Sequence, residues 1–65
     1  MSYTTALDYL KSKLEEERSN VVSFLSQGTI KDIEEYRRLC GVIQGLDAAK
    51  VLILDLEKRM ETDDE

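Results

Sequence analysis

The sequence predicts an all-α fold, an antiparallel helical hairpin. Apolar residues recur every three or four positions through two long segments, which is the period of an amphipathic helix. The chain contains no proline that would interrupt either segment, and a single Gly-Thr pair separates them. With 65 residues and no linker or internal repeat, residues 1–65 are expected to form a single helical-hairpin domain.

The first helix is predicted over about residues 5–26. Its lysines and glutamates, Lys11 among them, are expected on the outer face, and the apolar stripe is interrupted near Arg18. The inner face is expected to consist of Leu7, Leu10, Leu14, Val21, Phe24 and Leu25.

A turn over residues 27–29 is predicted to join the helices. Gly28 suits the left-handed residue that ends a helix, and Thr29 suits the N-cap of the next one, with Asp32 in its first turn. Because so short a connection makes neighbouring helices antiparallel, the chain is expected to fold back on itself and to place Leu14 near Ile43.

The second helix is predicted over about residues 30–61 and is the longer one. From about Leu54 onward it is expected to extend past the start of the first helix. Its main stripe is predicted to be Ile33, Tyr36, Cys40, Ile43, Leu46, Ala49, Ile53, Leu56 and Met60.

Two helices of this size bury little apolar surface. Ordering the chain costs roughly 100 kcal/mol, at about 1.5 kcal/mol per residue. Only one cysteine and no histidine are present, so neither an intrachain disulfide nor a Cys/His zinc site is available to help. We therefore expect the hairpin to complete a helical bundle, coiled-coil in style, by self-association or by docking on a partner.

Small residues repeat every four positions in the second helix. Each glycine inside a helix costs up to about 1 kcal/mol relative to alanine, so two of them in one turn need a reason. Close approach of another helix backbone supplies one. The sequence predicts a helix-packing ridge, within the hairpin or between chains, made of Gly41, Gly45 and Ala49.

A segment of the second helix is apolar almost all the way round. One facing helix covers only part of such a segment, so the remainder is expected to form an oligomer or docking surface. Tyrosine is enriched at interfaces, which adds the N-terminal tyrosines to the candidates. The candidate interface comprises Tyr3, Tyr9, Val51, Leu52, Leu54, Leu56 and Met60.

Composition argues against several other functions. Without histidine there is no Ser-His-Asp triad, and the runs of carboxylates do not converge on one point, so no catalytic, metal or cofactor residue is predicted. A net charge of −5 argues against nucleic acid, and Arg37 and Arg38 share their turn with acidic residues. The longest apolar run, of four residues, is far short of the roughly 20 needed to cross a membrane, and no signal peptide is visible.

The segment Glu35-Tyr36-Arg37-Arg38-Leu39-Cys40-Gly41-Val42-Ile43-Gln44-Gly45-Leu46 resembles small helical-hairpin proteins encoded by tailed bacteriophages. Their pattern is roughly Tyr-x-x-Leu-Cys-Gly-x-Ile-x-Gly-Leu, and the match covers mainly residues 30–65. The resemblance implies a phage-encoded protein and marks as packing positions Tyr36, Leu39, Cys40, Gly41, Ile43, Gly45 and Leu46. The architecture is also similar to that of the plasmid Rop protein, a hairpin that dimerises into a four-helix bundle.

The composition and the helix pattern predict a non-enzymatic structural or interaction protein, and the resemblance implies that it belongs to a phage. We expect a minor virion, capsid-attached or assembly component, located in the host cytoplasm during infection or in the virion. Its expected partners are a second copy of itself, as a dimer or higher oligomer, or a larger phage structural protein. Two alternatives remain: a small regulator that binds and inhibits a host or phage enzyme, and a Rop-like RNA-binding four-helix bundle.

Overall fold

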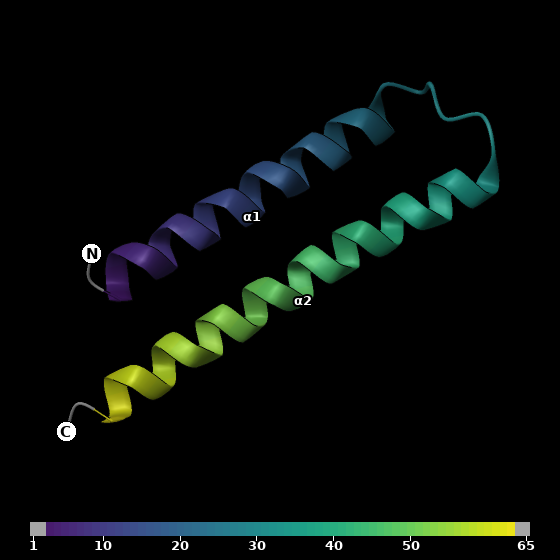
Figure 1. Cartoon of the computed structure of the whole chain (residues 1–65). Helices are drawn as coiled ribbons and strands as arrows, with labels where there is room; N and C mark the ends of the chain where they lie inside the picture. Colours follow the sequence, from purple (N-terminus) through teal and green to yellow (C-terminus); the bar gives the residue numbers. More distant parts are fainter. Residues whose placement is uncertain (1–2, 64–65) are drawn as a thin grey trace.

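The protein is an antiparallel hairpin of two long helices, as the sequence predicts (Figure 1). The computed structural model describes residues 3–63, with side chains for residues 4–62. Helix α1 spans Tyr3–Ser26 and helix α2 spans Ile33–Asp63. The hairpin measures 52 × 18 × 13 Å, and its radius of gyration of 15.3 Å exceeds the roughly 11 Å of a compact domain of this length. It is therefore a rod with a narrow seam.

The connection is longer than predicted and spans residues 27–32. Helix α1 ends as expected, because Gly28 adopts a left-handed φ of 72° and its amide donates to the carbonyl of Leu25 at 3.5 Å. The prediction that Thr29 is the N-cap of α2 is wrong. Asp32 caps α2 instead: its Oδ1 accepts from the amide of Glu35 at 2.7 Å. A carboxylate at this position also interacts favourably with the positive end of the helix dipole, which explains why the helix begins there.

Ion pairs between the helices define the register of the hairpin. The Nζ atom of Lys11 lies 3.0 Å from a carboxylate oxygen of Glu57, and Nε of Arg18 lies 2.8 Å from Oδ1 of Asp47. The predicted extension of α2 beyond the start of α1 from Leu54 onward is therefore wrong, as is the neighbourhood of Leu14 and Ile43 on which it depended. The start of α1 and the end of α2 lie level with each other at one end of the rod.

The longer connection explains this register. Because Arg18 pairs with Asp47 and both helices rise equally per residue, the end of α1 at Ser26 lies level with about residue 39. The first turns of α2 therefore project past α1 at the connection (Figure 1). Ile33 and Tyr36, predicted on the inner stripe, are accordingly 61% and 50% exposed.

The seam between the helices follows a seven-residue repeat. Its more buried residues are spaced alternately by four and three positions, as in a coiled coil. Such a repeat stays against the facing helix, whereas a stripe drawn at 3.6 residues per turn drifts around it. The seam consists of Leu7, Lys11, Leu14, Arg18, Val21 and Leu25 on α1, and of Leu39, Ile43, Leu46, Lys50, Ile53, Glu57 and Met60 on α2.

Charged residues thus occupy seam positions that were predicted to be apolar or outward-facing. Lys11 was expected on the outer face, but it is half-buried because its alkyl stem covers the seam while its ammonium pairs with Glu57. A hydrogen bond to that carboxylate, more than any other interaction, raises the pKa of Lys11. Glu15 similarly pairs with Lys50, and the hydrogen bond between Arg18 and Asp47 raises the pKa of the guanidinium.

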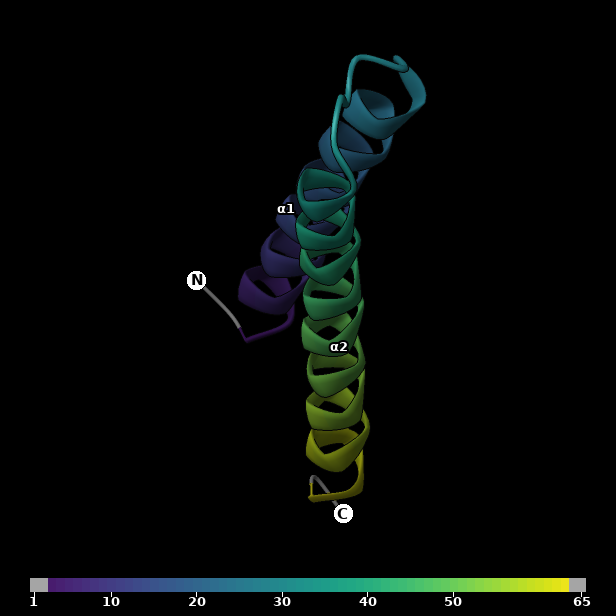
Figure 2. The same ribbon diagram turned by 90° about the vertical axis from the view of Figure 1, so that its right-hand side faces the viewer.

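The apolar core is small. Among the described residues, Leu7 and Leu39 are the buried apolar side chains, at 9% and 8% exposure. None of the described side chains is completely buried. The two helices cross at an angle in the view of Figure 2.

Candidate interaction surface

Helix α2 carries an uncharged stripe on one flank, which we call the flank stripe. At 100° per residue, its members lie about 90° around α2 from the seam. Three of its five residues have large, exposed side chains, with Leu52 at 69%, Leu56 at 45% and Val42 at 38% exposure. The flank stripe consists of Val42, Gly45, Ala49, Leu52 and Leu56.

The predicted ridge of Gly41, Gly45 and Ala49 does not close the hairpin. Both glycines are exposed, and a Cβ built on either would meet nothing within 4 Å beyond the adjacent backbone. Gly41 lies on the side of α2 opposite the seam, whereas Gly45 and the half-buried Ala49 belong to the flank stripe. The seam uses longer side chains, so the helices of the hairpin do not need the glycines. A role of this ridge between chains stays a prediction.

Helix α1 adds apolar residues on the same side of the hairpin. In an antiparallel pair with this repeat, the residues preceding the seam positions Lys11 and Leu25 lie next to the flank stripe. These residues are Leu10, 47% exposed, and Phe24, 40% exposed. The exposed Glu17 lies between them, so the α1 part of this side is mixed and the α2 part is uncharged.

The other flank of the hairpin is charged. The pairs of Arg18 with Asp47 and of Glu15 with Lys50 lie along it. Two predicted interface residues, Val51 at 63% exposure and Leu54 at 46%, lie on this flank of α2. The structure therefore divides the predicted interface: Leu52 and Leu56 lie on the flank stripe, while Val51 and Leu54 lie among charges.

The remaining predicted interface residues do not form one surface with these. Tyr9 is 59% exposed, and the ammonium of Lys13 lies 5.6 Å from the centre of its ring. Met60, predicted both on the main stripe and at the interface, is half-buried in the seam and lines a shallow groove together with Leu7. The side chain of Tyr3 lies outside the described residues.

The packing positions implied by the phage resemblance also divide. Leu39 is buried, and Ile43 and Leu46 are half-buried in the seam. Tyr36 is exposed near the connection, and a hydrogen bond to the half-buried Cys40 raises the pKa of its phenol. Tyr36 lies in the first turn of α2, which projects past the end of α1, so α1 does not cover it.

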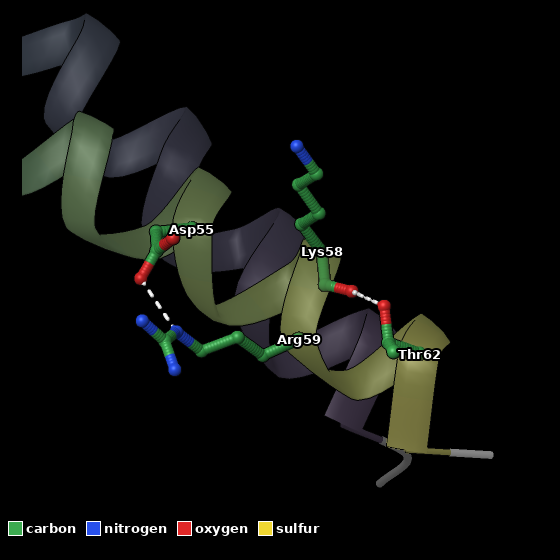
Figure 3. A pocket seen from close by; sticks show the side chains of 4 residues that line it. All are labelled: Asp55, Lys58, Arg59 and Thr62. Atoms are coloured by element: carbon green, nitrogen blue, oxygen red, sulfur yellow. Dashed lines mark hydrogen bonds and ion pairs between the residues drawn. The ribbon is translucent and has the colours of Figure 1, made fainter.

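Two further features bear on ligand binding. A second hollow, larger than the groove at Leu7 and Met60, is lined by residues of α2 (Figure 3). There Arg59 pairs with Asp55 at 2.9 Å, and the hydroxyl of Thr62 donates to the carbonyl of Lys58 at 3.1 Å. No described residue of α1 lines this hollow, so it is an open surface depression. In the described part of the chain, no group of three or more acidic or cysteine side chains is placed to hold a metal ion.

No helix within residues 3–63 combines the length and the apolarity required to cross a membrane. In comparisons with known proteins, no family model, no curated protein and no solved structure matches the chain. The resemblance to phage hairpin proteins therefore stays a prediction.

Proposed function

We propose that this chain is a non-enzymatic interaction protein whose hairpin completes a helical bundle by packing against another chain. The observation that carries the proposal is the size of its surface. The hairpin exposes 5294 Å², whereas a folded monomer of 7.5 kDa exposes about 4,200 Å². The difference, about 1,000 Å², is close to the roughly 800 Å² that each partner buries in a stable protein–protein interface.

The chemistry of the exposed residues supports association in preference to simple elongation. Large aliphatic side chains occupy both flanks of α2, with Val51 and Leu52 each more than 60% exposed. Isolated apolar residues are normal on a surface, but α2 presents several within four turns. Burying them against a second chain removes apolar area from water, which stabilises the assembly by about 25 cal/mol per Å² and adds to the small contribution of the two-helix core.

We further propose that the assembly is a phage structure, in which this chain is a minor virion, capsid-attached or assembly component. The support for this part is the Tyr36–Leu46 segment, which resembles phage-encoded hairpin proteins. Within that segment the exposed Gly45 leaves room for a close neighbour.

Quantitative mass spectrometry of purified particles of the phage that encodes the chain tests this role. A structural component remains at a constant number of copies per particle through density-gradient purification and washing. A matched measurement on early infected cells separates the regulatory alternative, which requires early synthesis and absence from particles. Absence from washed particles would refute the virion role.

A further inference from the structure

We infer that a second copy of this chain docks on the flank stripe of α2, so that two hairpins form a symmetric four-helix bundle in which α2 runs antiparallel to its counterpart. This inference rests on the proposed association function and specifies its partner and its surface. The two-fold axis passes beside Ala49, the middle residue of the stripe.

The spacing of the flank stripe matches itself when one copy is reversed. In a two-fold symmetric interface the same patch meets itself, so each residue faces the one at the mirrored distance from the axis. Val42 and Leu56 lie equally far from Ala49, at seven residues on either side. Reversal therefore places Val42 of one copy against Leu56 of the other, and Gly45 of one copy near Leu52 of the other. Because of the symmetry, each of these contacts occurs twice in the dimer.

Small and large residues alternate in this arrangement. Leu52 is the most exposed large apolar residue among those described, at 69%, and the space outside Gly45 is empty to 4 Å. A leucine from the second copy fills the space that a side chain at Gly45 would occupy. This alternation of large and small residues is how well-packed interfaces interdigitate. It also supplies the reason for a helix-weakening glycine that the hairpin itself does not need.

Charge distinguishes this flank from the other. The flank stripe contains no charged residue from Val42 to Leu56, and its continuations in either direction are Arg38 and Arg59. On the opposite flank Asp47 lies one turn before Val51 and is already paired with Arg18. Docking there would bury that ion pair, which is costly, whereas the flank stripe of α2 has its charged neighbours, Arg38 and Arg59, at its two ends. Glu17 is the exposed charge that α1 brings to this side.

The available area fits one such contact. The hairpin exposes about 1,000 Å² more than a compact monomer of its mass, and a standard interface buries about 800 Å² on each partner. A second copy on the flank stripe, reaching also the neighbouring Leu10 and Phe24 of α1, accounts for this excess without a further subunit.

Sedimentation equilibrium of the full chain tests the inference with two adjacent substitutions. Leu52→Glu and Val51→Glu introduce the same charge at residues of similar exposure, 69% and 63%, on opposite flanks of α2. We expect the wild-type chain and Val51→Glu to sediment as dimers. Leu52→Glu buries two carboxylates in the dimer, so its dissociation constant is expected to rise by at least about 100-fold. Circular dichroism shows whether each variant retains its helices.

Oxidative cross-linking gives a second readout that does not depend on weakening the dimer. In a Cys40→Ser background, Ala49→Cys places two thiols beside the axis, where a disulfide joins the copies, while Val51→Cys places them far apart. A dimer that survives Leu52→Glu, or one that Val51→Glu disrupts equally, would overturn this surface but leave association intact. A folded wild-type monomer at every concentration would overturn the second copy as the partner. The proposed phage role would then be judged separately by the particle measurement.

Discussion

The three glycines offer a sharp test of the structure, because alanine at each meets the same open space under different backbone conformations. Apart from the adjacent backbone, no atom lies within 4 Å of a Cβ added at Gly28, Gly41 or Gly45. Contact with residues elsewhere in the hairpin therefore contributes nothing to the difference between them. The backbone alone decides the sign: Gly28 has a φ of 72°, while Gly41 and Gly45 lie within α2.

Gly41→Ala is expected to stabilise the protein by about 1 kcal/mol, the difference in helix propensity between the two residues. Gly28→Ala is expected to destabilise it by about 1–2 kcal/mol, because a Cβ in the left-handed conformation approaches the neighbouring carbonyl. For a chain of this size 1 kcal/mol shifts the melting temperature by roughly 4–8 °C, so the two variants should melt on either side of the wild type.

Urea denaturation followed by far-UV circular dichroism, with all variants at one protein concentration, measures these differences. Gly41 lies outside the proposed dimer surface, so its gain should be the same at every concentration. Gly45→Ala should gain less as the concentration rises, since the added methyl group then meets Leu52 of the second copy. A destabilising Gly41→Ala would refute the reasoning, because it would require a close contact at a face that the structure leaves open.

Three other changes test the cap, the core and the seam. Asp32→Ala should lower the free energy of unfolding by about 1 kcal/mol, and Thr29→Ala by much less, in the same urea measurement; equal losses would contradict the cap at Asp32. Leu39→Ala should cost about 2 kcal/mol or more, since this side chain is only 8% exposed, and an unchanged melting temperature would contradict its burial. The pKa of Lys11 is raised above its ordinary 10.5 by the hydrogen bond to Glu57, so the folded chain holds that proton more tightly than the unfolded chain. This stabilisation is fully present below pH 10.5 and is lost as the pH rises through the raised value, and a pH series of urea melts on wild type and Lys11→Met should converge there.

The number and type of elements could be predicted from the sequence because they depend on local order. The spacing of apolar residues and the absence of proline define two helices, and Gly28 defines the end of the first. The start of the second helix was also legible in principle. Asp32 followed by Glu35 resembles a capping box, with aspartate in place of serine or threonine, and it competes directly with Thr29 for that role.

The residues of the seam could not be predicted from the spacing of apolar residues alone. Leu7, Leu14 and Val21 are separated by seven residues, and the positions between them are filled by Lys11 and Arg18. A reading that admits only apolar residues to the inner face passes over these charged side chains. Their place in the seam depends on partners more than 25 positions away in the chain, such as Asp47 for Arg18.

What the sequence by itself determined is that this protein consists of two helices, joined near Gly28, with more apolar surface than one pair can cover. Each of these properties follows from residues close together in the chain. Only the tertiary structure decided the register and, with it, the faces. In the register in which Lys11 pairs with Glu57, Gly41 and Gly45 of α2 face away from α1, and Leu52 is exposed. The rotation of a helix about its axis is decided by long-range contacts, so the surface it leaves exposed is decided there too.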